Sequence, residues 1–500
     1  MPDQLFAPPE NAQTAVTSQP AGSSVAVPSV PAATAAGAST AAPALAAPTL
    51  SPASAQSRPT PDAPHLVPTL RAKTAYYTVA RGDTLAAIAG RYQVDVATVA
   101  AANGITNPNL LSVGQALVIP PPSPKITAPA FKIIPDSELI FSPATTDFKL
   151  AAFILSRGGY LATYQEKVDD VTLSGAQIVD LVSREHSVNP RILLAVLEFQ
   201  GGWVLSSHPP SQYVDYPMGF FDHNRIGLYK QIFWAANMLN EGFYGWQQNQ
   251  FAAWSLADGT VARVEPTMNS GTAAVEYLMS LLRGADTWQN SVSSNGVYTT
   301  YFNLFGNPFD YTFSPLVPQG LAQPALQLPF ESGVQWYFTG GPHMGWDSGS
   351  PWAALDFAPE DVGWCNVSTA WEVALTDGLI VRSADGSVVL DLDGDGYEQT
   401  GWTILYLHVA AQDRIAAGTR VRAGDHIGHP SCEGGYAPAT HLHLARRYNG
   451  EWILADGPTP FVMDGWTAES AGSEYDGYLK KAGQVIEAWD GKSDGNKISR

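Results

Sequence analysis

The chain has 500 residues, a formal charge of −19 at pH 7 and only 15% charged residues. A length of this order predicts about three domains, and the negative charge argues against a nucleic-acid-binding surface. No apolar run is long enough for a transmembrane helix, and no basic stretch followed by an apolar one marks an export signal near the start.

Residues 1–74 are dominated by Ala, Pro, Ser and Thr and contain almost no aromatic residues. Such a segment cannot bury enough apolar surface to become ordered, and its prolines keep the chain extended. We therefore predict a disordered spacer, which could serve as a tether or as a flexible leader.

Residues 75–121 change abruptly to the pattern of a small folded module. A strand is expected from about residue 76, and Thr84 is placed to cap a helix whose apolar face includes Leu85 and Ile88. A second helix is expected at about residues 95–103, and a second strand at about 110–120. The predicted order is βααβ.

This segment closely resembles LysM modules, which bind the N-acetylglucosamine-containing glycan of peptidoglycan or chitin. The resemblance rests on Arg-Gly-Asp-Thr-Leu at the first helix, on Ala-Asn-Gly after the second, and on Val-Gly-Gln followed by Ile-Pro in the last strand. It implies a shallow glycan-binding groove between two loops. The groove residues expected here are Gly82, Asp83, Thr84, Ile105 and Asn107.

Residues 122–315 are predicted to form a helical domain. Apolar residues recur at helical spacing in four stretches, at about residues 174–182, 188–198, 226–240 and 271–282. The second of these helices resembles the start of a lysozyme-like transglycosylase domain, in which it ends in a catalytic Glu followed by Ser-Gly.

The position of that catalytic Glu is occupied here by Gln200. A neutral amide cannot protonate a glycosidic oxygen, and Glu198 lies about 200° away around the helix. We therefore expect an inactive lysozyme-like domain that binds glycan or supports its neighbour, with a second active site as the alternative.

The last large segment, residues 316–490, contains separated histidine and carboxylate elements. His343 precedes Asp356, which lies in an apolar stretch, and His408 follows in a strongly β-prone run. His441 and His443 are two positions apart on a predicted strand, so both should project to one face. Zinc binds imidazole and carboxylate ligands and keeps a position open for water when it is catalytic. A zinc-dependent hydrolase is predicted.

The order His…Asp…Tyr-x-His…His-x-His resembles the lysostaphin and staphylolysin group of zinc metallopeptidases, which cut peptides in bacterial cell-wall peptidoglycan. The resemblance covers roughly residues 330–463. It implies a mostly antiparallel β domain in which one zinc ion is bound, and it assigns two groups of side chains. The implied zinc ligands are His343, Asp356 and His443, and the implied general base and acid, also donors to the tetrahedral oxyanion, are His408 and His441.

The carboxylate ligand has two candidates. Most members of the group place the aspartate four positions after the first histidine, where this chain has Asp347. Staphylolysin-like members have a longer insertion and an aspartate followed by Phe and a small residue, as at Asp356. We favour Asp356, because Asp347 lies in a Gly- and Ser-rich stretch typical of a loop. His426 and His429 lie in a predicted turn and are not assigned to the site.

Only two cysteines occur, Cys365 and Cys432, and both lie in this segment. A disulfide between them would join loops around the metal and would suit an oxidising, extracytoplasmic setting. Two free thiols, or a cysteine nucleophile paired with His408 or His441, are the alternatives.

The carboxylates of Asp391, Asp393 and Asp395 resemble the first half of a calcium loop. The twelfth position of that loop would be Trp402, where a bidentate Glu is required. We therefore predict a long hairpin turn, with bound calcium as an option.

A closing hairpin is expected at residues 474–490, followed by a polar tail at 491–500. The predicted architecture is thus multidomain α+β: a LysM βααβ module, a helical lysozyme-like domain and a mostly antiparallel β metallopeptidase domain. The predicted function is a secreted or wall-associated zinc endopeptidase that hydrolyses peptidoglycan cross-links and is targeted by LysM. The alternative is a non-catalytic wall-bound activator or a peptidoglycan-binding protein with a structural zinc.

Overall fold

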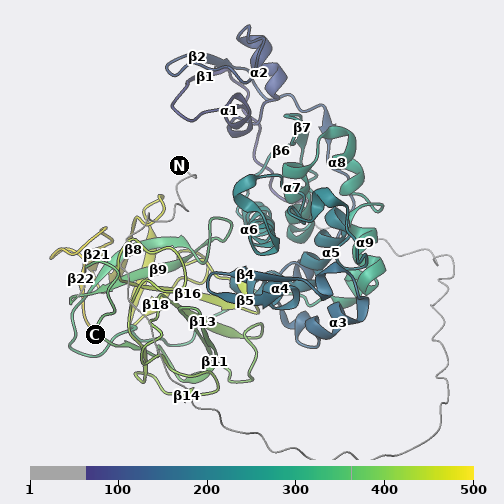
Figure 1. Ribbon diagram of the computed structural model, residues 1–500. Helices are drawn as coiled ribbons and strands as arrows, with labels where there is room; N and C mark the ends of the chain where they lie inside the picture. The colour runs from purple at the N-terminus through teal and green to yellow at the C-terminus, as the bar shows by residue number, and fades with distance from the viewer. Residues whose placement is uncertain (1–63, 362) are drawn as a thin grey trace, which may run out of the picture. The chain divides into compact units, whose positions relative to one another are not determined.

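The computed structural model describes residues 64–361 and 363–500 (Figure 1). The disorder expected for residues 1–63 lies outside this part of the chain. Residues 64–74, also assigned to the spacer, form no helix or strand, but the His65 ring stacks on Trp246 with centroids 4.4 Å apart. The spacer therefore ends before residue 74. Within the described residues, no helix combines the length and the apolar character that crossing a membrane requires.

The LysM-like module has the predicted βααβ order. Its elements are β1 (Ala75–Thr78), α1 (Leu85–Arg91), α2 (Val96–Ala102) and β2 (Ala116–Ile119). The strands pair antiparallel over a small core that includes Leu85, Ile88 and Val99. The Thr84 side chain caps α1, because its Oγ1 accepts a hydrogen bond from the Ala87 N–H at 3.1 Å. The second strand is shorter than the expected 110–120.

The middle segment is helical, as predicted, and all four expected helices are present. Its helices are α3 (Leu150–Arg157), α4 (Gly175–His186), α5 (Pro190–Gly201), α6 (Leu228–Gln247), α7 (Ser270–Leu282), α8 (Ala285–Ser291) and α9 (Val297–Phe305). Short strands β3 (Ile126–Thr127), β6 (Ala253–Ser255) and β7 (Val261–Arg263) form one sheet, and β4 (Gln165–Val168) and β5 (Val171–Ser174) form a hairpin. Helices α3, α8 and α9 were not predicted, because elements of two to three turns give little periodic signal.

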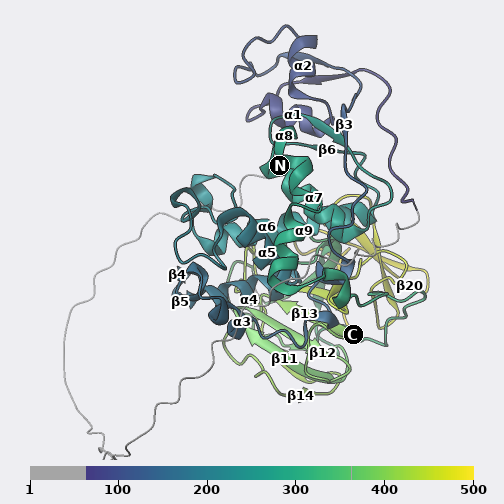
Figure 2. The same ribbon diagram turned by 90° about the vertical axis from the view of Figure 1, so that its right-hand side faces the viewer.

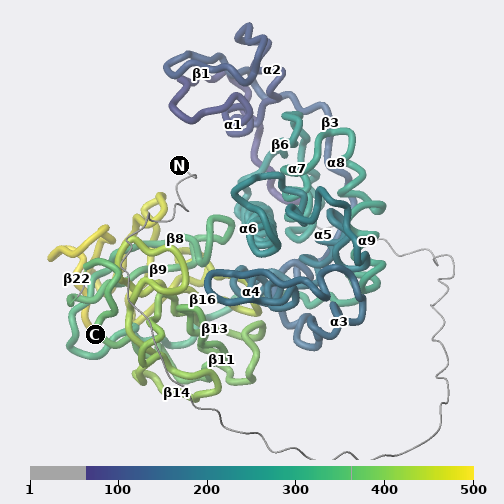
Figure 3. The backbone as a smooth tube through the Cα atoms, in the orientation of Figure 1, coloured from purple at the N-terminus to yellow at the C-terminus, as the bar shows by residue number. Residues whose placement is uncertain are grey.

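The C-terminal segment is built of antiparallel strands, as predicted. Its main sheet contains β8 (Trp336–Met344), β9 (Trp352–Pro359), β11 (Gly378–Ala384), β12 (Ser387–Asp391), β13 (Trp402–Leu407), β14 (Arg420–Val421), β16 (Leu442–Tyr448), β17 (Glu451–Trp452) and β22 (Lys497–Ile498). The strand order is β14-β11-β12-β13-β16-β9-β8-β22, with β17 paired to β16. Figure 3 traces β8, β9 and β16 side by side. Smaller sheets are formed by β10 (Glu372–Val373) with β15 (His426–Gly428), and by β18 (Val462–Met463), β19 (Trp466–Ser470), β20 (Gly477–Lys481) and β21 (Gln484–Glu487).

The two faces of the main sheet pack against different partners. Successive side chains of a strand point to opposite faces. Leu355 and Leu444 belong to the core of the C-terminal segment, whereas Ala354 and Ala445 belong to the core that contains the middle helices. Asp356 and His443 alternate in phase with Ala354 and Ala445. Asp356 and His443 therefore lie on the face that packs against the middle domain. Figure 2 shows α4 of the middle domain next to β13 of this sheet.

A buried ionic cluster also joins the two domains. The Glu398 carboxylate, in the turn between β12 and β13, lies 2.8 Å from an Arg184 nitrogen of α4, 3.2 Å from Arg382 and 3.8 Å from Arg447. Burial alone would raise the pKa of Glu398, but the three guanidinium groups outweigh burial and hold this pKa below its usual value.

The chain end differs from the expectation. The predicted closing hairpin is present as β20 and β21, which pair antiparallel. Residues 491–500, expected to be a polar tail, include β22, which pairs with β8 through Lys497 opposite Tyr337. Ile498 is buried there. The tail is therefore an edge strand of the main sheet, and one buried isoleucine in a polar stretch was too little signal to predict it.

A buried carboxyl group in α7 should make the stability of the protein depend on pH. Glu276 is fully buried, and burial raises its pKa to about 8, although the Trp254 indole N–H donates to it at 2.9 Å. The unfolded chain releases this proton near the ordinary pKa, so stability falls as pH rises from about 4.5 to 8. We expect Glu276→Gln to remove this loss, which reaches about 5 kcal/mol.

Urea unfolding at pH 5, 7 and 9, followed by tryptophan fluorescence, measures this difference. The exposed Asp286→Asn is the matched control and should run parallel to the wild type. Parallel profiles for the wild type and Glu276→Gln would contradict the buried neutral acid.

Candidate metal centre

Three neighbouring strands bring two histidines and one aspartate together. His443 on β16 is directly opposite Asp356 on β9 in the antiparallel register. His343 lies near the end of β8, where the pairing with β9 shifts its register between Gly340 and His343. The shift changes which face the side chain of His343 reaches. All three side chains are buried, with exposed fractions of 2% for His343, 7% for Asp356 and 6% for His443.

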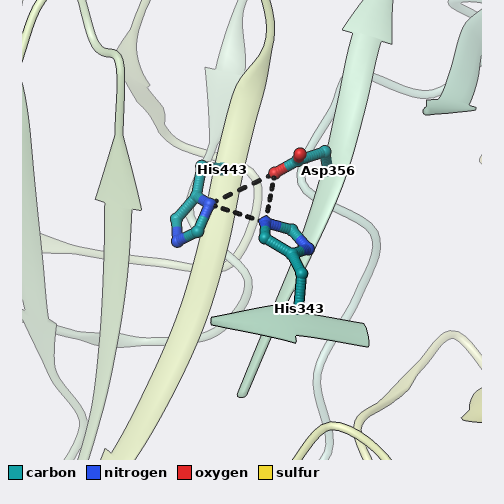
Figure 4. A group of neighbouring side chains, drawn as sticks. All are labelled: His343, Asp356 and His443. Carbon is teal, nitrogen blue, oxygen red and sulfur yellow. Dashed lines mark hydrogen bonds and ion pairs between the residues drawn. The ribbon is translucent and has the colours of Figure 1, made fainter. Parts of the chain in front are cut away.

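The three facing atoms form a nearly equilateral triangle (Figure 4). His343 Nε2 lies 3.0 Å from His443 Nδ1, and each of these nitrogens lies 3.2 Å from Asp356 Oδ1. Ligands that bind zinc tetrahedrally at about 2.0–2.1 Å lie about 3.3–3.4 Å from one another. The triangle therefore has the size of one face of a zinc coordination tetrahedron.

The outer ring nitrogens determine where the protons of the two imidazoles reside. His343 Nδ1–H donates to the Gly341 carbonyl at 2.8 Å, and His443 Nε2–H donates to the Gly345 carbonyl at 3.1 Å. In the neutral tautomers, the inner nitrogens that face each other, His343 Nε2 and His443 Nδ1, then carry lone pairs. Asp356 Oδ1 faces them and has no hydrogen-bond donor of its own. Three electron-rich atoms that converge without a proton between them fit a cation, so the residues suit zinc.

Asp356, not Asp347, takes part in this group. Asp347 lies in the loop between β8 and β9, where its carboxylate accepts the Ser348 N–H at 2.6 Å. The preference for Asp356 agrees with this geometry.

The two further predicted histidines lie beside the triangle. The rings of His408 and His441 are 4.5 Å apart, and His441 Nε2 lies 3.7 Å from Asp356 Oδ2. His408 Nδ1–H donates to the Glu433 carbonyl at 2.9 Å, and His441 Nδ1–H donates to the Ala439 carbonyl at 2.8 Å. Both Nε2 atoms are thus left as proton acceptors. Burial, followed by the nearby His441 and His443, lowers the pKa of His408 to about 3, so it is neutral at physiological pH.

The backbone at His408 differs from the sequence expectation. The predicted strand runs through this residue, but β13 ends at Leu407 and His408 has a left-handed φ of 70°. Such a conformation is uncommon for a residue with a side chain and is often found at functional sites. The main chain is held there by Ser431, whose N–H and Oγ–H donate to the His408 carbonyl at 2.7 and 2.8 Å.

The predicted disulfide is present, and it joins the two chain segments whose hydrogen bonds hold His408 and His441 in place. Cys365 and Cys432 are bonded to each other, which excludes the free-thiol and nucleophile alternatives. Cys432 lies between Ser431 and Glu433, which hold His408. Beside Cys365, the carbonyls of residues 364 and 366 accept from the Thr440 hydroxyl at 2.8 and 2.6 Å. Thr440 directly precedes His441.

Sequence reasoning missed several supporting groups. The carbonyls of Gly341, Gly345 and Glu433 act through the backbone, and residue types do not reveal such a role. Tyr475 stacks on His343 with ring centroids 4.3 Å apart. Its place in the predicted closing hairpin was known, but nothing in the sequence linked that hairpin to the first histidine.

The turn of Asp391, Asp393 and Asp395 gives no support for calcium. The three carboxylates do come together, and β12 and β13 form the predicted hairpin around them. However, these carboxylates accept the turn's own donors: Asp391 takes the N–H groups of Gly394 and Gly396, and Asp395 takes that of Tyr397. The turn is stabilised without an ion.

His426 and His429 lie outside the metal group, as predicted. His426 is in strand β15 rather than in a turn, and its ring stacks on Trp371 with centroids 4.1 Å apart. Both imidazoles contact that same indole, since the His429 ring lies 3.8 Å from it.

The predicted glycan-binding residues lie in two loops of the LysM-like module. Asp83 accepts the Tyr77 hydroxyl and the Ala80 N–H at 2.8 and 2.7 Å, so it stabilises its own loop. Ile105 packs against the module's core, and Asn107 is exposed. Thr84 is committed to the helix cap, and Gly82 has a left-handed φ of 90°.

In the middle domain, Gln200 occupies the position where the lysozyme-like resemblance places a catalytic Glu, and Glu198 lies two residues earlier. Gln200 is buried and its amide nitrogen lies 3.7 Å from the Met279 sulfur, which accepts from it. Glu198 accepts the N–H groups of Val204 and Leu205 at 2.8 and 3.0 Å, so it holds the loop after α5. Both side chains are thus engaged in contacts within the domain, and the expectation of an inactive domain stays a prediction.

Two family models match parts of this chain. Residues 77–120 match the LysM domain, which confirms the resemblance drawn from the sequence. Residues 132–318 match a family described as "LasA, N-terminal domain". The lysozyme-like ancestry proposed for this segment stays a prediction.

Several solved structures are similar to part of this chain. The M23 metalloprotease pseudoalterin from the deep sea is 24% identical, with a TM-score of 0.29 over 36% of this chain and 99% of that chain. The catalytic domain of lysostaphin from Staphylococcus simulans is 23% identical, with a TM-score of 0.19 over 24% and 89%. A zinc-containing peptidase from Vibrio cholerae is 17% identical, with a TM-score of 0.21 over 28% and 41%.

Zinc content should distinguish the two aspartates. We expect Asp356→Ala to lose bound zinc, because it removes one corner of the triangle, and Asp347→Ala to retain it. Elemental analysis of the purified full chain after zinc loading and gel filtration gives the stoichiometry. Loss of zinc in Asp347→Ala with retention in Asp356→Ala would reverse the assignment.

Proposed function

We propose that this protein is a zinc endopeptidase that hydrolyses peptide cross-links of bacterial peptidoglycan and is held at its substrate by the LysM domain. The observation that carries the proposal is the convergence of His343, Asp356 and His443 beside the imidazoles of His408 and His441. A purely structural zinc site is normally closed by four protein ligands. Three ligands with two proton acceptors alongside are the arrangement of a hydrolytic site.

The proposed chemistry assigns a separate task to each group. His343, Asp356 and His443 would hold the zinc ion, which when bound lowers the pKa of a coordinated water and polarises a carbonyl. Nε2 of His408 or His441 would take the proton of the attacking water. An imidazole that has taken this proton becomes a donor, so it can stabilise the oxyanion and then protonate the leaving amine.

The rest of the chain supports the proposed location and substrate. The LysM match supplies a module for the glycan strand of the same polymer. The Cys365–Cys432 disulfide suits a protein that works in an oxidising compartment, so we propose a secreted or wall-associated enzyme.

The decisive experiment is mass spectrometry of the fragments released from defined peptidoglycans. Glycine-bridged and directly cross-linked substrates should be incubated with the wild-type full chain and with His443→Ala. We expect new peptide termini from at least one substrate with the wild type, and none with the variant, because His443 is the ligand on the central strand. The bond that is cut then identifies the substrate class.

Two outcomes contradict this proposal. Unchanged release by His443→Ala would exclude the zinc mechanism. A wild type that carries zinc but releases no peptide would favour the alternative of a wall-bound activator or a peptidoglycan-binding protein with a structural zinc.

Thr440 should affect turnover without affecting zinc. Thr440→Val keeps the shape but removes the hydroxyl that donates to the carbonyls of residues 364 and 366, which loosens the support of His441. One such hydrogen bond corresponds to about 1.4 kcal/mol, so we expect kcat to fall roughly 10-fold with KM and zinc content unchanged. Thr440→Ser restores the hydroxyl and should restore kcat. A low kcat in both variants would contradict the role of the hydroxyl.

A further inference from the structure

The loop between β8 and β9, residues 345–351, connects two of the candidate ligands and supports the third. It joins the strand of His343 to the strand of Asp356, and its Gly345 carbonyl accepts the Nε2–H of His443. That hydrogen bond directs the Nδ1 lone pair of His443 towards the metal position. Outer partners of this kind control ligand orientation and metal affinity. The geometry of the metal centre therefore depends on where residue 345 is held.

The tip of this loop is held by the middle domain. Asn237 of α6 is 7% exposed, and its side-chain amide donates to the Ser348 hydroxyl at 2.7 Å. The Asn237 Oδ1 accepts the Gly349 N–H, also at 2.7 Å. A Cβ at position 349 would come within 1.9 Å of the Asn237 carbonyl oxygen, so only glycine permits this approach. One buried asparagine thus satisfies a donor and an acceptor of the other domain.

The base of the loop is held from the same helix. A Cβ at Gly345 would lie 2.8 Å from the Trp452 ring, so the backbone of residue 345 packs directly on that indole. The backbone N–H of Trp452 donates to the side-chain hydroxyl of Tyr244 in α6 at 3.0 Å. Tyr244 and Asn237 are seven residues apart and therefore lie on one face of the helix. The tip of the loop therefore contacts this face directly, and the base of the loop is connected to it through Trp452.

We infer that α6 of the middle domain is a positioning element of the metal centre: Asn237 and Tyr244 hold the loop whose Gly345 carbonyl orients His443. The ligand face of the sheet is also the face that packs against the middle helices, so the contact is part of a continuous core. The inference rests on the proposed zinc site, but it concerns metal affinity rather than peptide cleavage. The middle domain then contributes to zinc binding without supplying a ligand.

Zinc affinity of the full chain tests this inference. The apo protein should be titrated with zinc against a competing chromophoric chelator, for the wild type, Asn237→Ala, Ser348→Ala and the double variant. We expect Asn237→Ala to bind zinc about 10-fold more weakly, as is typical when an outer partner is lost. The double variant should bind little more weakly than Asn237→Ala alone, because the two substitutions break one shared contact.

A control separates positioning from general weakening of the middle domain. Gln231 lies on the same helix and is fully buried, and its amide donates to the carbonyls of Phe220 and Arg225 at 2.6 and 2.8 Å. None of these partners belongs to residues 345–351. Gln231→Ala should therefore keep wild-type zinc affinity. The visible absorption of the cobalt-substituted protein should change in Asn237→Ala and remain unchanged in Gln231→Ala.

Three results would overturn the inference: wild-type affinity in Asn237→Ala, an equal loss in Gln231→Ala, or a wild type that binds no zinc. The fate of the proposed peptidase is decided separately by fragment release. A wild type that binds zinc with the expected variant pattern but cleaves no cross-link would reject the peptidase and leave the role of α6 intact.

Discussion

The constraint at the centre of the C-terminal domain is that three potential metal-ligand atoms face each other at 3.0 to 3.2 Å. Backbone carbonyls accept from the outer nitrogens of His343 and His443, so in the neutral tautomers the inner nitrogens and Asp356 Oδ1 would repel one another. Strand pairing of β9 with β16 nonetheless holds them within 3.2 Å. A cation at the centre would relieve this repulsion, so metal binding and the stability of the sheet are linked.

The central strand β16 carries this constraint because both of its faces are covered. Leu442 and Leu444 pack in the domain's own core, while Ala445 packs with the middle helices. Its charged residues are buried as well: burial lowers the pKa of Arg447 to about 10, and Glu398 opposes this effect. Arg447 also donates to the carbonyl of Arg184 at the end of α4. The strand that provides His443 is therefore bonded to the middle domain.

Sequence patterns predicted the elements that have long or specific signals. The βααβ module, the helices α4 to α7 and the antiparallel hairpins follow from periodicity and capping residues, and the histidine order indicated the members of the site. Local patterns failed where the decisive contact lies far away in the chain. Strand β13 ends at Leu407 because Ser431 holds the next carbonyl, and the chain end becomes β22 because β8 has a free edge for it.

The sequence by itself determined which chemical groups are available: four histidines and an aspartate in a metallopeptidase order, two cysteines and a module for glycan. It favoured Asp356 over Asp347 only from the residues around each aspartate, because both are near His343 in the chain. The tertiary structure supports this choice, since the register of β9 against β16 places Asp356 opposite His443. It also revealed the role of the middle domain, because Asn237 and the 345–351 loop are more than a hundred residues apart and meet only when the sheet packs on α6.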